Sequence, residues 1–273
     1  MNFIGKWKLW FGLSLLIIGM GMFFLFSKGL NKGIDFVGGT SMIIRFEDPD
    51  VNVASIREII NIENVMITNV DKDIIVKMKV LSPDEETAFK KILKEELGEY
   101  EVLETSMIGP AIGEKLKTQS FKILLLTIGL LLVYITFRFE FWYGLAAIIA
   151  LIHDALVVLG FAAFLQLEVN IAFVAALLTV LGYSINDTIV VFDRIREEQH
   201  ENKTKIDIAT VANNSIHKTL GRSINTTLTT FFVVISLVLF GGITIREFAL
   251  VLLIGITAGA YSSIFIASPA YVL

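Results

Sequence analysis

The chain has 273 residues, of which 55% are hydrophobic and only 18% are charged. Soluble domains usually carry about 25% charged residues, so this composition, with a mean hydropathy of +0.72, predicts an integral membrane protein. The absence of cysteine excludes disulfides, thiol catalysis and cysteine metal sites, and three histidines are too few for a histidine-rich metal site. The net charge of −4 says little, because the charges cluster in separate segments.

Six apolar stretches come close to the roughly 20 residues that a helix needs to cross the hydrocarbon core of a bilayer. The first is longer than the core of a usual signal peptide and is not followed by a small-residue cleavage pattern, so we interpret it as a retained anchor. The six predicted spans are Leu9–Phe26, Phe121–Phe137, Phe141–Leu165, Ile171–Phe192, Ser223–Phe240 and Phe248–Leu273.

The distribution of Lys and Arg in the short loops predicts the orientation of these spans. With a cytoplasmic N-terminus and C-terminus, the short outside loops contain only Arg246, and the other basic loop residues lie inside. The sequence then predicts three parts: a cytoplasmic N-terminus with the first span (residues 1–27), an extracytoplasmic domain (28–120), and a five-helix bundle (121–273) with a cytoplasmic loop at about 193–221.

The segment 28–120 alternates between strand and helix patterns. Strands are predicted at 42–47, 65–70, 74–80 and 100–108, with a hairpin turn at 71–73. One helix begins after the N-cap Asn52, and a second follows the Ser82–Glu85 capping box and ends at Gly98. The order βαββαβ predicts an α+β ferredoxin-like domain, a fold that hosts many functions. The second helix is expected to bury Phe89, Ile92, Leu93 and Leu97.

Polar residues inside the spans are the candidate functional residues, because such groups are costly in a bilayer and usually face the bundle interior or a water path. Asp187 lies six residues before Asp193, where the charged loop begins, which places it roughly 9 Å inside the membrane boundary. Arg222 enters the fifth span at a similar depth, so an Asp187–Arg222 ion pair is geometrically plausible and would hold the carboxylate ionised. The candidate ion-pathway residues are Tyr183, Ser184, Asn186, Asp187, Thr188 and Arg222, and the possible polar support comes from His153, Asp154, Asn225 and Thr229.

Less specific interpretations stay open for several of these residues. Asp187 could be only a buried hydrogen-bonding residue, Arg222 could extend to the membrane interface, and His153 with Asp154 is favoured as a structural tie between helices. The small residues Gly255, Gly259 and Ser263 predict close helix packing in the sixth span. In the charged loop, an apolar face at Ala209, Ala212, Ile216 and Leu220 indicates either an amphipathic helix on the membrane surface or a solvated connector.

Four sequence runs resemble the SecD and SecF proteins of the protein-export machinery. The run GIDFVGGT at 33–40 is similar to the signature that follows the first span in both, and the runs at 181–197, 219–230 and 261–269 resemble three spans of SecF. In the first run, the glycines suit a tight turn and Asp35 is expected to be structural, as a cap. The signature residues are Gly33, Asp35, Gly38 and Gly39.

The resemblance implies an accessory subunit of the Sec translocase in the cytoplasmic (inner) membrane of a prokaryote. It implies pairing with SecD in a twelve-helix bundle like that of resistance-nodulation-division transporters, and use of a proton or sodium gradient to drive late steps of polypeptide translocation. The ion-path aspartate of the family falls on Asp187 and its arginine on Arg222, here flanked by Gly221 and Ser223 in place of the usual serine and threonine. Other implied partners are the Sec channel (SecY, SecE and SecG), YajC-type or insertase subunits, the translocating polypeptide and membrane lipid. No nucleic acid, enzyme activity, metal or resident cofactor is expected.

Two alternatives belong to other functional classes. A small-molecule exporter of the resistance-nodulation-division superfamily would have a larger outer region with a drug-sized apolar pocket. An intramembrane aspartyl protease would use Asp154 and Asp187 together, but their predicted depths differ by roughly 11 Å.

Overall fold

The computed structural model describes residues 2–60, 65–70, 72–201 and 207–273. The chain divides into two compact units, a helical unit of Met1–Asn31 with Lys122–Leu273 and an outer unit of Lys32–Phe121. Within the described residues, six helices are long and apolar enough to cross a membrane. The protein is therefore a multi-pass membrane protein, as its composition predicts.

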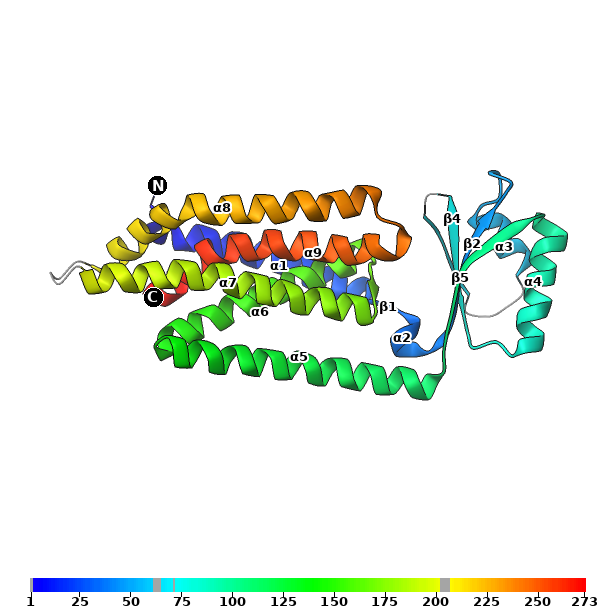
Figure 1. Ribbon diagram of the computed structural model, residues 1–273, viewed down its shortest axis with the longest axis horizontal. Helices are drawn as coiled ribbons and strands as arrows, with labels where there is room; N and C mark the ends of the chain where they lie inside the picture. The colour runs from blue at the N-terminus through cyan, green and yellow to red at the C-terminus, as the bar shows by residue number, and fades with distance from the viewer. Residues whose placement is uncertain (1, 61–64, 71, 202–206) are drawn as a thin grey trace. The chain divides into compact units, whose positions relative to one another are not determined.

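The helical unit contains the six predicted spans (Figure 1). The third span matches its prediction at both ends, whereas the second, fourth and fifth helices extend beyond the apolar stretches because their polar ends continue the same helix. The elements of this unit are η1 (Ile4–Lys6), α1 (Trp7–Lys28), most of α5 (Pro110–Arg138), α6 (Phe141–Leu165), β6 (Glu168–Val169), α7 (Ile171–Glu201), α8 (Ile208–Phe240), α9 (Ile243–Ser262), η2 (Ser263–Ala267) and α10 (Ser268–Val272).

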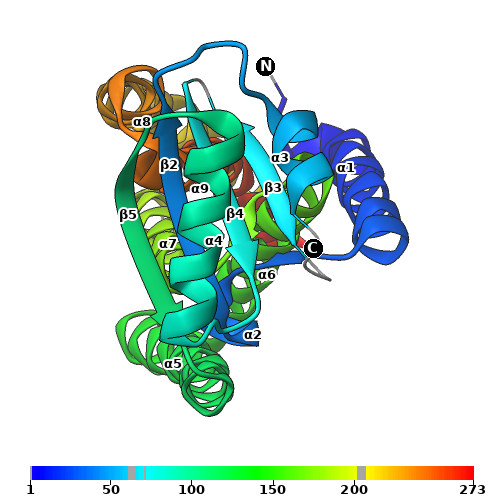
Figure 2. The same cartoon turned by 90° about the vertical axis from the view of Figure 1, so that its right-hand side faces the viewer.

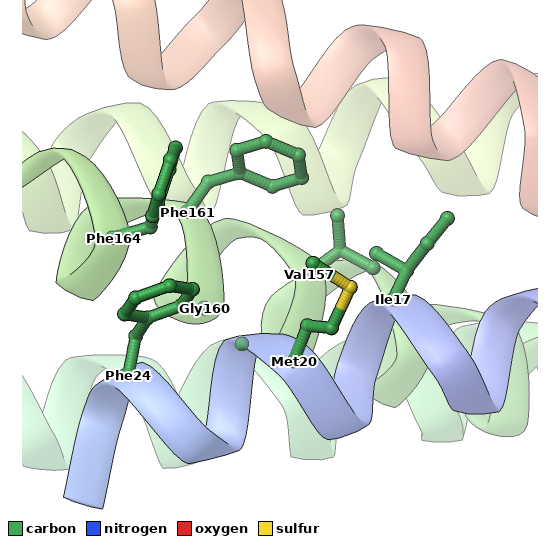
Figure 3. A pocket seen from close by; sticks show the side chains of 8 residues that line it. Ile17, Met20, Phe24, Val157, Gly160, Phe161 and Phe164 are labelled. Carbon is green, nitrogen blue, oxygen red and sulfur yellow. The ribbon is translucent and has the colours of Figure 1, made fainter. Parts of the chain in front are cut away.

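Small residues bring the helix backbones into direct contact, as predicted for the sixth span. Gly255 of α9 packs on the side chain of Val180 of α7, and a Cβ atom at Gly259 would lie 2.9 Å from the Cβ of Ser184. A second contact of this kind joins α1 to α6, where a Cβ atom at Gly21 would lie 2.7 Å from the Cα of Gly160. Figure 3 shows the apolar side chains of these two helices around a cavity of about 140 Å³ beside that contact.

The outer unit is the predicted ferredoxin-like domain. Its four antiparallel strands lie in the order β3-β4-β2-β5, and α3 and α4 cover one face of the sheet (Figure 2). Met42 of β2 pairs with Val76 of β4, and both side chains are fully buried under the helices. The elements are β1 (Asn31–Lys32, which begins in the helical unit), α2 (Ile34–Val37), β2 (Gly39–Phe46), α3 (Val53–Ile59), β3 (Met66–Val70), β4 (Asp73–Met78), α4 (Pro83–Leu97) and β5 (Tyr100–Ile108).

The predicted helix starts in the outer unit are confirmed. The side chain of Asn52 accepts hydrogen bonds from the backbone N–H groups of Ala54 and Ser55, at 2.9 and 3.2 Å. Ser82 and Glu85 form both hydrogen bonds of the capping box. The expected burial of Ile92 is wrong, since 43% of its surface is exposed. Phe89 and Leu93, which are four residues apart on one face of α4, are the buried residues, and the predicted turn at residue 71 lies outside the described residues.

The GIDFVGGT motif is a tight structural junction. Gly38 and Gly39 have φ angles of +76° and +139°, in the region that favours glycine. A Cβ atom at Gly39 would lie 2.5 Å from the carbonyl oxygen of Met78, so a side chain there would push β2 away from β4. Asp35 is not the N-cap residue of α2: Gly33 holds that position, and Asp35 lies in the first turn of the helix.

In its described part from residue 207 onward, the charged segment before the fifth span is neither a surface helix nor a solvated connector. Residues 202–206 of this segment lie outside the described residues, and α8 then runs without a break from Ile208 into the span. Ala212 and Ile216 are fully buried in the main core of the helical unit. The backbone N–H of Phe3 also donates to Asn213 at 2.7 Å. The predicted apolar face therefore packs against the bundle instead of lying on lipid.

Candidate ion-path site

Asp187 is a buried carboxylate on α7, with 9% of its surface exposed. The hydroxyl of Ser223 on α8 donates to Oδ1 at 2.7 Å, and the hydroxyl of Ser263 on η2 donates to Oδ2. In the part of the chain that the structure describes, Asp187 forms no ion pair. A carboxylate held only by hydroxyl groups can bind a cation or a proton, because each hydroxyl can rotate and accept as well as donate.

The predicted Asp187–Arg222 ion pair is not formed. Arg222 is exposed on α8 and makes no hydrogen bond or ion pair with the described residues of this chain. The neighbouring Ser223 occupies the place facing Asp187 and is only 2% exposed. Adjacent residues of a helix differ in direction by about 100°, so Ser223 and Arg222 cannot both face α7.

A second carboxylate, Asp154 of α6, is fully buried in the same bundle. Its Oδ2 accepts from the hydroxyls of Ser184 at 2.5 Å and Ser262 at 2.8 Å. Its Oδ1 lies 2.9 Å from Nδ1 of His153, and Nε2 of His153 lies 3.0 Å from the hydroxyl of Ser14 on α1. His153 and Asp154 thus connect α1, α6, α7 and α9, as expected of a tie between helices.

Two adjacent serines on the last span connect the two aspartates. Ser262 bonds to Asp154, and Ser263 bonds to Asp187. This is the point where α9 changes into the π-helical turn η2, a local irregularity that is frequent at functional sites. Each serine hydroxyl also has a second acceptor within reach, the carbonyl three residues earlier, at 3.2 Å in both cases.

The other predicted site residues fall into two groups. Ser184 and Thr188 are buried in the bundle, and the hydroxyl of Tyr183 donates to the carbonyl of Thr226 at 3.1 Å. Asn186 of α7 is exposed. So are Asn225 and Thr229 of α8, which share the exposed polar face of Arg222. The structure therefore gathers Ser184, Asp187, Asp154 and His153, and it leaves Arg222, Asn186, Asn225 and Thr229 on the surface of this chain.

Sequence reasoning missed four hydroxyl residues that hold the buried charges. Ser223, Ser262, Ser263 and Ser14 are each at most 4% exposed. Serine is frequent in membrane helices as a packing residue, so a single serine gives no signal. The adjacency of Ser262 and Ser263 in the last span was the one available indication.

The geometry also bears on the protease alternative. An aspartyl protease needs two carboxylates that share a proton. Here every carboxylate oxygen of Asp154 and Asp187 has its own serine or histidine partner, and the two aspartates do not bond to each other. The arrangement suits two separate binding groups better than a catalytic pair.

Comparison with known proteins gives consistent results along the chain. Residues 88–273 match the model of the family described as protein export membrane protein SecD/SecF, C-terminal, and residues 23–50 match the SecD/SecF GG motif. The protein translocase subunit SecF of Sebaldella termitidis is 39% identical over 96% of this chain and 88% of its own length. The SecF subunit of Calditerrivibrio nitroreducens is 40% identical over 98% of this chain and 92% of its own length.

A solved structure also matches. The crystal structure of SecDF from Thermus thermophilus, described as a translocon-associated membrane protein, superposes with a TM-score of 0.91 and 38% identity. The match covers 99% of this chain but only 38% of the SecDF chain. Family models, full-length relatives and the shared fold agree, and the chain belongs to the SecD/SecF family of protein export membrane proteins.

Proposed function

We propose that the chain is a SecF-type subunit of the Sec translocase, which uses the movement of protons or sodium ions past Asp187 to drive late steps of polypeptide export. The full-length relatives are protein translocase subunits. The observation that carries the ion-coupled part is the setting of Asp187, a buried intramembrane carboxylate whose described partners are the hydroxyls of Ser223 and Ser263. Such a group is costly in a membrane, so a carboxylate inside a span is by default a candidate for binding or transport.

Ion binding at Asp187 would change its hydrogen bonds. A proton on the carboxylate removes an acceptor, and Ser263 then has the carbonyl of Ala260, 3.2 Å away, as its alternative partner. A sodium ion would instead need the oxygen atoms of Asp187, Ser223 and Ser263, with both hydroxyl protons turned away. In either case the contacts that join α7, α8 and η2 are altered, which is what a transporter needs to convert ion movement into a change of shape.

A SecD-type partner is expected on the polar face of α8. Arg222, Asn225 and Thr229 are exposed there, inside a helix long enough to cross a membrane. Lipid cannot satisfy such groups, so a protein surface or a water-filled path must cover them. The match to one part of the longer SecDF chain supports a partner that corresponds to the remainder.

The orientation that we propose from the basic residues of the short loops has the outer unit outside the cytoplasm.

The test replaces Asp187 with asparagine in cells depleted of their own subunit and measures export of a secreted reporter. Asp187→Asn keeps the shape and hydrogen-bonding capacity of the side chain but removes the ionisable group. Asp193→Asn is the matched control, because Asp193 lies on the same helix with 44% of its side chain exposed and pairs with Arg138 at the surface, where ion pairs contribute little.

Loss of export with Asp187→Asn but not with Asp193→Asn, at equal membrane levels, is the expected result. Collapse of the proton and sodium gradients in separate experiments then identifies the ion. Normal export with Asp187→Asn would mean that Asp187 is only a packing residue and that the ion-coupled mechanism is wrong.

A further inference from the structure

The pair His153–Asp154 is more than a tie between helices, because the hydrogen bonds around it fix its proton content. His153 is 7% exposed and Asp154 is fully buried. Each hydroxyl around the pair has only one proton to donate, and a backbone carbonyl can only accept. These rules are sufficient to assign the protons.

The first proton lies on Nε2 of His153. The hydroxyl of Tyr261 on α9 donates its one proton to the carbonyl of Trp10, at 2.9 Å. Its oxygen must therefore accept from Ser14, 3.3 Å away, which uses the one hydroxyl proton of Ser14. The oxygen of Ser14 is then an acceptor for Nε2, at 3.0 Å, so Nε2 carries a hydrogen.

The second proton lies between Nδ1 of His153 and Oδ1 of Asp154. These atoms are 2.9 Å apart, and without a proton between them a lone pair of the imidazole would face a carboxylate oxygen. The proton is on Nδ1 or on Oδ1, and the pair has no net charge in both cases. The pair therefore holds one proton more than a neutral imidazole beside a carboxylate.

Apart from each other, the bonded partners of His153 and Asp154 among the described residues are serine hydroxyls and not charged side chains. Ser184 of α7 and Ser262 of α9 donate to Asp154, and Tyr261 of α9 stacks on His153 with ring centres 5.8 Å apart. On the other helices packed against α6, the further ionisable groups are Tyr183, Asp187 and the cluster at 193–201 on α7, Arg246 and Glu247 near the start of α9, Lys8 and Lys28 near the ends of α1, and Tyr271 of α10, which is bonded to Gln199.

We propose that His153 and Asp154 form a second proton-binding site, and that its occupancy sets the number of hydrogen bonds between α1 and α9. When the site releases one proton, the neutral imidazole keeps the hydrogen on Nδ1 that faces the carboxylate, and Nε2 becomes an acceptor. Ser14 then turns its only proton to Nε2. The hydroxyl of Tyr261 has one proton, so it can donate either to the carbonyl of Trp10 or to the oxygen of Ser14, but not to both. The two hydrogen bonds between α1 and α9, from Ser14 to Tyr261 and from Tyr261 to Trp10, thus become one.

Two further features concern the pair: a cavity lies beside His153, and α1 leads along the chain toward the outer unit. His153 lines a cavity of about 410 Å³ that is also bounded by Leu13, Phe161, Thr257 and Tyr261 and does not include Asp187. In the chain, α1 ends at Lys28, and the outer unit begins at Lys32. A change in how α1 is held thus acts on the helix that leads into that unit. The link to export rests on the proposed function, whereas proton binding itself does not.

The experiment uses the full chain in lipid nanodiscs. Trp7→Phe and Trp142→Phe leave Trp10 as the only one of the three tryptophans; its ring lies 4.5 Å from that of Phe265 on η2, so its emission reports on the contact of α1 with the last span. Infrared difference spectra against pH detect proton binding by carboxyl and imidazole groups. In the parent chain both signals are expected to change in one shared transition.

The variants separate binding from coupling. Asp154→Asn and His153→Gln should each abolish that infrared transition and the Trp10 change, while Ser14→Ala should keep the infrared transition and lose the Trp10 change. Ser236→Ala, which removes a serine of α8 whose hydroxyl donates, within the described residues, to the carbonyl of Phe232 on the same helix, should behave as the parent.

Three outcomes would overturn the proposal. If Asp154→Asn and His153→Gln both titrate as the parent does, the pair binds no proton. If Ser14→Ala keeps the Trp10 change, the coupling to α1 does not pass through Ser14. If Asp187→Asn abolishes the transition while Asp154→Asn retains it, the signal belongs to Asp187. Persistence of the transition in Asp187→Asn supports the second site, even if the export assay shows Asp187 itself to be dispensable.

Discussion

Gly259 of α9 lies directly against Ser184 of α7, close enough that a Cβ atom at Gly259 would be 2.9 Å from the Cβ of Ser184. Ser184 in turn donates to the buried carboxylate of Asp154 at 2.5 Å. The absence of a side chain at Gly259 therefore lets Ser184 form its hydrogen bond to a buried carboxyl group on a third helix, α6.

Gly259→Ala should destabilise the bundle by about 1–3 kcal/mol, because the new methyl group overpacks a tight contact and displaces the hydroxyl of Ser184 from Asp154. Gly182→Ala on α7 is the matched control, since a Cβ atom there meets no neighbour within 4 Å. Thermal unfolding in detergent gives the measurement. Equal midpoints for the two variants would show that α7 and α9 can separate without cost.

Gly21→Ala should loosen α1 from α6. The Cβ atom would lie 2.7 Å from the Cα of Gly160, and backbone cannot rotate away as a side chain can, so the helices must move apart at a cost of about 1–3 kcal/mol. Gly19→Ala, two residues away on the same helix, meets nothing within 4 Å. A cross-linking assay between cysteines placed on α1 and α6 should show a lower yield for Gly21→Ala only. An unchanged yield would contradict the contact.

Ser223→Ala should lower the stability of the isolated chain more than Arg222→Ala does, whereas Arg222→Ala should weaken association with a SecD-type partner more than Ser223→Ala does. Ser223 donates to Asp187, and a hydrogen bond to a charged group is worth about 1.5–3 kcal/mol, so Ser223→Ala should lower the stability of the isolated chain. Arg222 is exposed, and its replacement should change that stability by less than about 0.5 kcal/mol. In the complex with a SecD-type partner, Arg222→Ala should weaken association. A strong loss of stability with Arg222→Ala in the isolated chain would contradict the structure.

The stability of the outer unit should fall in acid partly through Glu85. The hydrogen bond from the backbone N–H of Ser82 holds the pKa of Glu85 below its ordinary value, with help from the Ser82 hydroxyl and Lys79. A carboxylate with a lowered pKa in the folded state stabilises it above the unfolded pKa of about 4.3, and this contribution is lost as the pH falls through the folded value.

Glu85→Gln should therefore be less stable than the parent at neutral pH and should lose less stability between neutral and acid conditions. Urea unfolding of the outer unit in the full chain, followed by a fluorophore on a single Glu96→Cys label, gives the measurement. Glu95→Gln, at the other end of α4, serves as the control and should keep the acid dependence of the parent. A pH dependence in Glu85→Gln equal to that of the parent would show that the capping box does not contribute.

Local patterns in the sequence were sufficient for the architecture. A span is defined by the length of its apolar run, and the capping box at Ser82 and Glu85 by residues three positions apart, so neither needs knowledge of distant parts of the chain. The same is true of the βαββαβ order of the outer unit, in which each strand and helix shows its own periodicity. Depth in the membrane also follows from sequence, because the rise per residue of a helix is constant.

Only the tertiary structure decided which residues share a site. The rotation of α8 about its axis places Ser223 rather than Arg222 against Asp187. That rotation cannot be read from the sequence, because this part of α8 carries polar residues on more than one side. The π-helical turn at Ser263 likewise directs two adjacent serines to two different aspartates. The sequence determined that Asp154 and Asp187 lie within membrane spans. The packing of α6, α7, α8 and α9 determined their partners, because a hydrogen bond depends on the positions of both helices that it joins.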